Sequence, residues 1–322
     1  MALLKLNTAK SGVVFSEELK QSAMAANSLL HSGKGAGNDF LIADNRDGHI
    51  TEKDGVLSSV LTDGTLWSKS IVDLCDRRYG VGADGLMLLD AGTVDTECRP
   101  SGTDFHMTYF NSDGSGGMMC GNGGRCMVAF ASDMGITHFD FEAADGFHTA
   151  QILDTAHGIK TVRLKMKDVD AVQTYNSLTG VKVPSSGSFL DTGTRHYVRF
   201  VADLDYYDIV SEGRDIRYHA QELLPAGANV NFVEPYDGGI KVRTYEKGVE
   251  DETFACGTGI VASCVAAWCG GVKPSSEENA RVRYEVKAKR DLLAVDFMPS
   301  SVAEDVWLTG PASFVAEIIL PD

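Results

Sequence analysis

The sequence lacks the features that mark several common classes of protein. No stretch of its 322 residues approaches the roughly 18 to 20 consecutive apolar residues that a membrane-spanning helix requires. Positive charge is in the minority, with 29 lysines and arginines against 45 acidic residues, so the formal net charge is −16. Phosphate backbones and anionic lipids are poor partners for such a surface. We therefore expect no nucleic-acid partner and no membrane partner.

Targeting and disulfide signals are also missing. The first residues, MALLKLNTAKSGVVFSEELKQ, fit neither a secretory signal nor an arginine-rich transit peptide, which favours a cytoplasmic location. The seven cysteines are an odd number, and in a chain of this length they do not form the disulfide framework of a small domain. We expect the thiols to be reduced.

The spacing of cysteines and glycines excludes familiar metal and cofactor sites. The gaps from Cys120 to Cys126 and from Cys256 to Cys264 are C-x5-C and C-x7-C, and neither is typical of structural zinc. The phosphate-loop pattern GxxxxGK[ST] is absent, and GNGGR lacks the acidic residue that completes a dinucleotide-binding fingerprint. We expect no metal and no cofactor.

Two similar glycine-rich turns are present. With 43% hydrophobic and 23% charged residues, the chain has the composition of a globular protein and the length of two ordinary domains. CGNG starts at Cys120 and CGTG starts at Cys256, and each turn follows a strand-like segment and opens a helix-like one. This repetition predicts two domains of similar plan that face one another across a cleft.

A cysteine and glycines at the start of a helix have a definite chemistry. The glycines let the backbone approach a ligand, and the first amide N–H groups point outward at the positive end of the helix dipole. Such a turn binds a carboxylate, and it also lowers the pKa of a cysteine from its ordinary value of about 8.5. By itself, however, a cysteine in a glycine-rich turn is more often a small buried hydrophobic residue.

Two such turns together predict a two-thiol reaction. The helix ends would hold the α-carboxylate of an amino acid, with the sulfurs of Cys120 and Cys256 on opposite sides of the α-carbon. One thiolate would remove the α-proton, and the opposite thiol would return a proton to the other face. The configuration would thereby be inverted, and no electron-sink cofactor is needed if the donors are preorganised.

The chain resembles the diaminopimelate epimerase family from about residue 33 to its end. The matching segments, in order, are GAGNDF, DRRYGVGADG, FNSDGS, CGNGGRC, NVNF, YEKGVEDET, ACGTG and LTGPASFV. The resemblance implies an α/β (α+β) fold of two pseudo-symmetric domains, each with a curled, mixed or antiparallel sheet around a central helix. We expect one domain to comprise residues 1–164 with a returning strand at 312–322, and the other residues 165–311. Residues 1–30 would be an extension of unclear role, with one short helix across residues 16–30, where leucines and alanines recur at roughly helical spacing.

The resemblance also implies an activity and a set of site residues. Members interconvert LL- and meso-diaminopimelate without a cofactor, for lysine and peptidoglycan precursor synthesis. Cys120 and Cys256 would exchange the roles of base and acid. The resemblance assigns the reacting carboxylate to four residues: Gly121, Asn122, Gly257 and Thr258. It assigns the other substrate contacts to Asn38, Asn111, Asn229 and Lys247. Support of the thiols is assigned to His196 and Glu246, and Glu246 also accepts a hydrogen bond from the substrate ammonium. Without the resemblance, the asparagines would equally be turn-formers or caps, and His196 a hydrogen-bonded strand residue.

Some positions depart from the family pattern. Lys247 replaces an arginine, and Thr194 replaces a binding asparagine, both in the pocket for the distal end of the substrate. Gly85 stands where some members have glutamine, and Ala316 replaces an aromatic residue that some members use in a homodimer contact. Two alternatives therefore stay open: a racemase or epimerase of the same fold acting on another amino acid, and a non-catalytic amino-acid-binding protein.

Overall fold

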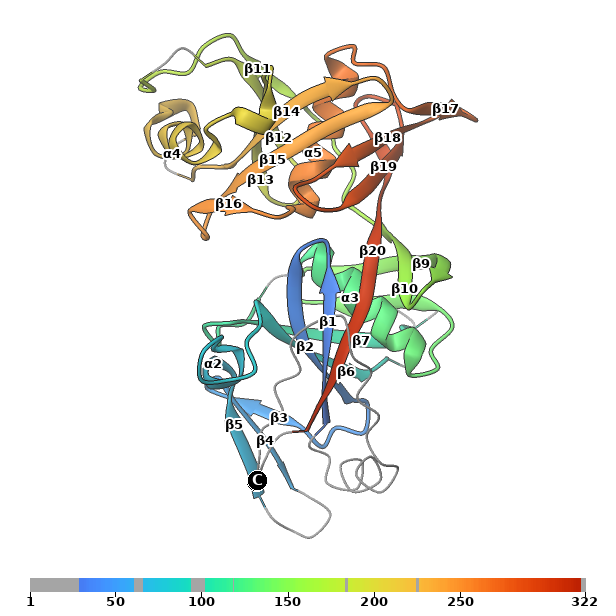
Figure 1. Ribbon diagram of the computed structural model, residues 1–322. Coiled ribbons are helices and arrows are strands. Elements are labelled where there is room, and N and C mark those ends of the chain that lie inside the picture. The colour runs from blue at the N-terminus through green and yellow to red at the C-terminus, as the bar shows by residue number, and fades with distance from the viewer. Residues whose placement is uncertain are drawn as a thin grey trace. The chain divides into compact units, whose positions relative to one another are not determined.

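The computed structural model describes residues 29–60, 66–93, 102–117, 119–182, 185–223 and 226–319. The chain forms two compact units, one of residues 1–160 with 312–322 and the other of residues 161–311 (Figure 1). The boundary expected after residue 164 falls in the strand that leaves the first unit, β10 (Ile159–Lys165). Within the described ranges, no helix is both long enough and apolar enough to cross a membrane.

The first unit is mainly β-structure. Its elements are β1 (Leu29–Gly35), β2 (Asn38–Asn45), β3 (Thr51–Lys53), β4 (Val56–Val60), β5 (Leu66–Ser70), α2 (Ile71–Cys75), β6 (Gly85–Ala91), β7 (Phe105–Asn111), α3 (Gly121–Asp133), β8 (Phe139–Ala143), β9 (Gly146–Ala156), the start of β10, and the end of β20 (Glu304–Ile319). The short helix expected across residues 16–30 lies largely outside the described residues. Its last two residues belong to β1, where the backbone pairs with β20.

The strands of the first unit close around helix α3. Pairing runs from β1 through β2, β6, β7, β8, β9, β10 and β20 and back to β1. Every residue of α3 from Gly121 to Ala131 is buried, as expected for a helix that is surrounded rather than laid on one face of a sheet. Strands β3, β4 and β5 form a separate antiparallel sheet.

The second unit repeats this plan with different strands. Its elements are β11 (Gln173–Tyr175), β12 (Gly187–Asp191), β13 (Arg195–Phe200), η1 (Leu204–Tyr206), α4 (Ile209–His219), η2 (Gln221–Leu223), β14 (Asn229–Tyr236), β15 (Gly239–Glu246), β16 (Asp251–Thr253), α5 (Gly257–Cys269), β17 (Ser276–Glu278), β18 (Arg281–Lys287) and β19 (Leu292–Met298), together with parts of β10 and β20. Helix α5 packs against β12, β13, β14, β15 and β19 and is buried over nearly its whole length. The expected fold class, a curled sheet around a central helix in each of two domains, is confirmed.

The two central helices start in the same way. Each has 13 residues, begins with a glycine, and has a cysteine in extended conformation at the N-cap, Cys120 in α3 and Cys256 in α5. Neither cysteine side chain caps its helix. The expected strand, turn and helix around each cysteine are therefore present, and the repetition of the two segments extends to their backbone conformation.

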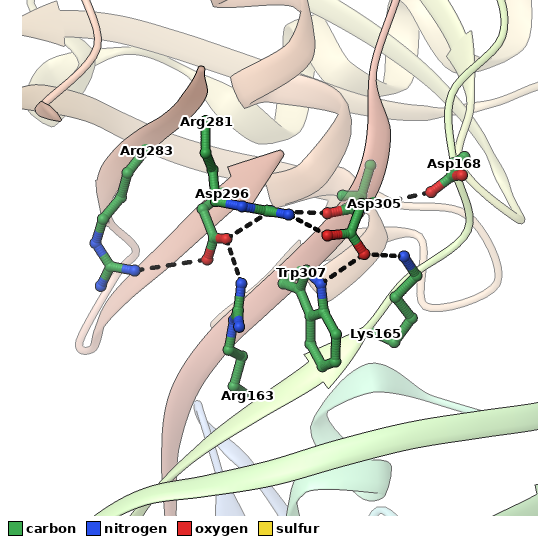
Figure 2. Close-up of polar contacts among 9 residues, drawn as sticks. Arg163, Lys165, Asp168, Arg281, Arg283, Asp296, Asp305 and Trp307 are labelled. Carbon is green, nitrogen blue, oxygen red and sulfur yellow. Dashed lines mark hydrogen bonds and ion pairs between the residues drawn. The ribbon is translucent and has the colours of Figure 1, made fainter. Parts of the chain in front are cut away.

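Charged side chains join four strands of the second unit, including the two that continue into the first (Figure 2). Asp296 on β19 accepts hydrogen bonds from Arg163 on β10, at 2.5 Å, and from Arg281 on β18, at 2.8 Å. Arg281 also binds Asp305 on β20, which pairs in addition with Lys165 on β10. Only 6% of the Asp296 side chain is exposed, so the centre of this cluster is largely buried. The cluster thereby holds β10 and β20, the two strands that continue into the first unit.

Candidate active site

In the first unit the site is built on the start of α3. Cys120 is partly buried, and its backbone is extended at the N-cap position, directly before the first turn of the helix. Strand β1 passes directly over this turn: a Cβ atom on Gly35 would lie 2.6 Å from the carbonyl oxygen of Asn122. Glycine at position 35 therefore permits the close approach. The amide groups and dipole of this helix end are suited to stabilise an anion.

A line of hydrogen bonds connects two expected binding residues in this unit. Asn122 donates from Nδ2 to Oδ1 of Asn38, at 2.7 Å, and accepts at Oδ1 from Arg125, at 2.6 Å. Asn38, at the first position of β2, donates in turn to Asp84 at 2.9 Å. Asn122 and Arg125 are 1% and 0% exposed. The structure thus brings Asn38 and Asn122 together and links both to charged residues.

Asn111, the last residue of β7, is placed differently. Its side chain donates to Oγ of Ser115 at 3.0 Å, and its main-chain carbonyl accepts from Gly114 at 3.0 Å. Asp113 in turn accepts from the main chain and the hydroxyl of Ser115. These contacts fit the turn-forming role that the residue type alone suggested.

In the second unit the site is built on the start of α5. Cys256 is 8% exposed, and its Sγ lies 3.5 Å from Oγ1 of Thr258 in the same turn. A Cβ atom on Gly259 would lie 2.3 Å from the side-chain oxygen of Asn231, so glycine is needed there for the helix to meet strand β14. The CGTG sequence therefore serves both the helix start and its packing.

His196 lies behind this turn, fully buried on β13. Its Nδ1 faces Nδ2 of Asn231 at 3.1 Å, and the same Nδ2 also donates to the main-chain carbonyl of Tyr197 at 3.3 Å. Thr244 donates to the amide oxygen of Asn231 at 2.9 Å, which agrees with this orientation of the amide. Because Nδ2 can only donate, Nδ1 of His196 is the acceptor and Nε2 carries the hydrogen.

The Nε2 hydrogen of His196 points at two threonine hydroxyls. Nε2 lies 3.0 Å from Oγ1 of Thr258 and 2.9 Å from Oγ1 of Thr194, and the two hydroxyls are 3.0 Å apart. Burial lowers the pKa of His196 from 6.5 to about 3, so the ring is neutral near pH 7. It can polarise Thr258 but cannot supply a positive charge to Cys256.

Two further expected binding residues, Asn229 and Lys247, lie at the first position of β14 and directly after β15. Asn229 accepts at Oδ1 from the main-chain nitrogen of Lys247, at 2.8 Å, and donates to the carbonyl of Arg195, at 3.3 Å. The Nζ of Lys247 donates to the carbonyl of Ala226 at 2.8 Å. Glu246 ends β15 beside them and is half-buried. Asn229 and Lys247 are thus brought together, but by main-chain contacts.

The other described cysteines are poorly suited to catalysis. Burial raises the pKa of Cys126 to about 12 and that of Cys75 to about 11, and it raises the pKa of Cys264 well above its ordinary value. A thiol with such a pKa is almost wholly protonated at neutral pH, so almost no thiolate is available to take a proton. Cys120 and Cys256 instead stand at helix starts, at the positions that the glycine motifs singled out.

Four polar residues next to these sites were missed from the sequence: Arg125, Asp84, Asn231 and Thr244. Asn231 could have been found, because it is a polar residue in the apolar strand NVNF, two positions after Asn229 and therefore on the same face. Arg125 is one helical turn from Asn122, a spacing that also places both on one face. No local signal connects Asp84 with Asn38, since the two are far apart in sequence.

Solved structures with the same fold include a phenazine biosynthesis protein and a probable proline racemase. A phenazine biosynthesis protein of the PhzF family from Bacillus anthracis matches with a TM-score of 0.59 and 14% identity, over 91% of this chain and 99% of that one. A probable proline racemase from Agrobacterium radiobacter K84 matches with a TM-score of 0.60 and 14% identity, over 91% and 92%. These similarities establish the class of fold, a two-domain α+β fold that is shared with racemases and epimerases.

Sequence comparison identifies the family within that class. The sequence model of the diaminopimelate epimerase family matches residues 32–170 and 188–292. A diaminopimelate epimerase of Flavobacterium psychrophilum is 37% identical over 89% of this chain and 98% of its own length, and one of Chlorobaculum tepidum is 38% identical over 87% and 96%. The chain belongs to the diaminopimelate epimerase family and is an isomerase. The expected family and enzyme class are confirmed, and the hypothesis of a non-catalytic binding protein is set aside.

Proposed function

We propose that the chain interconverts LL- and meso-diaminopimelate by proton transfer at the α-carbon between Cys120 and Cys256. Family membership supports the substrate. The observation that carries the mechanism is the repeated helix start: each unit has one buried helix of 13 residues that begins at a cysteine followed by glycine. Each unit therefore supplies one sulfur and one set of outward-pointing amide groups.

The reaction follows from these two groups. A thiolate at one cysteine takes the α-proton: the C–H bond breaks, an S–H bond forms, and the electron pair delocalises into the α-carboxylate. The amide N–H groups of the helix starts, at Gly121 and Gly257, stabilise the charge that develops on its oxygens. The thiol of the other cysteine then gives its proton to the opposite face of the carbon, and that cysteine becomes the thiolate.

The surroundings of Cys256 support a thiolate at that position. His196 is neutral and donates from Nε2, so the hydroxyl of Thr258 can accept this hydrogen and donate its own toward Cys256. A neutral donor stabilises the thiolate less than a cation would, so the sulfur keeps the basicity that proton abstraction needs. We assign His196 and Glu246 to support of the thiols, and Asn38, Asn122, Asn229 and Thr258 to substrate binding.

Solvent deuterium exchange tests the proposal. Purified protein in D2O is incubated with LL-diaminopimelate, and α-deuterium incorporation and the meso product are followed by NMR and chiral chromatography. Both should appear in the wild-type protein, and Cys120→Ser or Cys256→Ser should lower kcat by at least ~1,000-fold, as removal of an acid or base from a coupled pair does. Full activity in either variant would exclude the two-thiol mechanism.

Another amino acid is the second candidate substrate. The observation in its favour is that neither departure from the family pattern presents a clamp for a distal carboxylate. Lys247 directs its ammonium to the carbonyl of Ala226, and Thr194 directs its hydroxyl to His196 and Thr258. A panel of amino acids in the same deuterium assay separates the candidates, because diaminopimelate should have the highest kcat/KM of the panel.

The remaining expectations are part of the same proposal. We place the reaction in the cytoplasm, with a small amino-acid substrate, no cofactor, and neither nucleic acid nor membrane as a partner. The excess of acidic residues, 45 against 29 basic ones, supports the last two points. A homodimer is the assembly that family membership suggests, and sedimentation velocity would test it.

A further inference from the structure

Three hydrogen bonds join Arg125, Asn122, Asn38 and Asp84, and all three run in the same direction from donor to acceptor. From Arg125, the donors and acceptors follow each other in order: guanidinium to Asn122 Oδ1, Asn122 Nδ2 to Asn38 Oδ1, and Asn38 Nδ2 to an oxygen of Asp84, over 2.6, 2.7 and 2.9 Å. We call these four residues the amide relay. Its first member can only donate, and its last, as a carboxylate, can only accept.

The charged ends fix the orientation of both amides between them. If the side-chain amide of Asn38 rotated by half a turn, its oxygen would face the oxygen of Asp84 and its nitrogen would face the nitrogen of Asn122. If Asn122 rotated, it would present nitrogen to the Arg125 guanidinium. Asn122 and Arg125 are buried, so water is poorly placed to satisfy the reversed groups.

Asp84 is itself held by the backbone and by Arg77. The main-chain nitrogen of Asp84 donates to the main-chain carbonyl of Asp39 at 2.9 Å. Arg77 binds the carboxylate oxygen of Asp84 that Asn38 does not use, at 2.7 Å. Arg77 also binds both oxygens of Asp39, at 2.6 and 2.9 Å. Burial raises the pKa of Asp39, but Arg77 lowers it more, and the net pKa is below the ordinary value. The acidic end of the relay is therefore rigid.

The guanidinium end is fixed to the helix that carries Cys120. Arg125 donates from Nη1 to the carbonyl of Gly121 at 3.2 Å, while Nη2 binds Asn122. One side chain thus contacts the first two residues of α3. The relay connects this helix start to the first residue of β2.

We propose that Arg125 and Asp84 are positioning residues: they fix the buried amide of Asn122 and, with it, the direction in which Asn38 presents its N–H and C=O groups to the substrate. The inference rests on the proposed function only in taking Asn38 as a substrate ligand. Asn38 uses one amide hydrogen on Asp84 and one oxygen lone pair on Asn122, and it offers the substrate the other hydrogen and lone pair at fixed positions. If the Asn38 amide were reversed, its donor and acceptor would change places. Each polar group of the substrate would then face a group of the wrong hydrogen-bonding type.

Asp84→Asn tests the proposal, because it keeps the shape of the side chain but removes its charge and its acceptor-only character. An asparagine at position 84 can donate or accept, so Asn38 can adopt both orientations. We expect KM for diaminopimelate to rise at least tenfold and kcat to change by less than threefold. Two-dimensional NMR of protein labelled with 15N-asparagine should show the Asn38 side-chain NH2 signals shifted or doubled.

The matched control is Asp39→Asn. This change removes the other carboxylate of Arg77 but leaves the bond from Asn38 to Asp84 in place, so KM should stay within twofold of the wild-type value. Equal effects of the two substitutions on KM would mean that the Arg77 cluster has a structural role only, and would overturn the proposal. An unchanged KM and unchanged Asn38 signals in Asp84→Asn would also overturn it.

Two further measurements keep the test decisive. If Asp84→Asn does not fold, Arg125→Lys replaces it, since lysine keeps the charge but cannot contact Gly121 and Asn122 as a fork; KM should rise in the same way. If wild-type protein does not exchange deuterium with diaminopimelate, the proposed function fails. In that case the NMR signals of Asn38, compared between ligand-free wild-type protein and Asp84→Asn, still test whether Asp84 orients the Asn38 amide.

Discussion

The Nε2 atom of His196 lies 3.0 Å from Oγ1 of Thr258, and this hydroxyl lies 3.5 Å from the sulfur of Cys256. A histidine on β13 thus reaches the cysteine at the start of α5 through a threonine. The hydroxyl is the connecting group, because it can accept from the ring and donate its own hydrogen to the sulfur. Its removal should therefore affect the acidity of the thiol.

Thr258→Val should raise the pKa of Cys256 and lower kcat about tenfold or more, the usual range for a hydrogen bond to a charged group. The measurement is the pH dependence of alkylation of Cys256 by iodoacetamide, followed by mass spectrometry. Thr258→Ser is the control, since it retains the hydroxyl and should retain the wild-type profile. An unchanged profile in Thr258→Val would remove Thr258 from the contacts that stabilise the thiolate.

The buried His196 should also make stability depend on pH. Its pKa is lowered by burial from 6.5 to about 3, so the unfolded chain binds a proton between these values and the folded chain does not. Stability is then lost as the pH falls through this window. We expect the Tm of the wild-type protein to fall more steeply between about pH 6.5 and 4 than the Tm of His196→Gln.

His31 provides no alternative explanation for that difference. Burial also lowers its pKa, but both proteins contain it, so its contribution cancels in the comparison. Parallel curves of Tm against pH would show that His196 does not change its protonation on unfolding. Tm is measured by calorimetry in buffers of equal ionic strength.

The buried thiols should be protected in the native protein. Burial raises the pKa of Cys126 to about 12 and that of Cys264 well above its ordinary value, so neither forms a thiolate near pH 7.5. We expect iodoacetamide to modify Cys120 at least ~100-fold faster than either, and to modify all of them at similar rates in urea. Peptide mass spectrometry distinguishes the sites. Fast modification of Cys126 in folded protein would contradict the packing of α3.

Asp296 should be the most sensitive residue of the charged cluster in Figure 2. Its side chain is 6% exposed and pairs with Arg163, Arg281 and Arg283, so Asp296→Asn leaves three guanidinium groups without their shared counter-charge. We expect a loss of about 3 kcal/mol in the free energy of unfolding, as for other broken buried ion pairs. Urea denaturation measures it.

A surface pair provides the control for Asp296. Asp205 accepts from Lys241 at 2.8 Å, but 67% of its side chain is exposed. Solvent screens such a pair, so Asp205→Asn should leave the urea midpoint nearly unchanged. Similar losses from both substitutions would mean that burial does not set the strength of these contacts.

The sequence by itself determined the local structure around both cysteines. CGNG and CGTG predict a helix that starts directly after Cys120 and Cys256, and α3 and α5 do start there. These signals are local, because glycines and the apolar residues that follow act within one or two turns of chain. The motifs also identified the family, and with it a sheet around each central helix.

Only the tertiary structure decided which polar side chains meet. Asn38 and Asn122 are 84 residues apart and His196 and Thr258 are 62 apart, and each pair is joined by a strand packed on a buried helix. The tautomer of His196 depends on Asn231, which lies two residues after Asn229, the register partner of His196, and on the same face of the sheet. Hydrogen bonds need alignment within a few tenths of an ångström, and chain patterns do not specify distances between distant segments. Packing of the strands around α3 and α5 supplies that alignment.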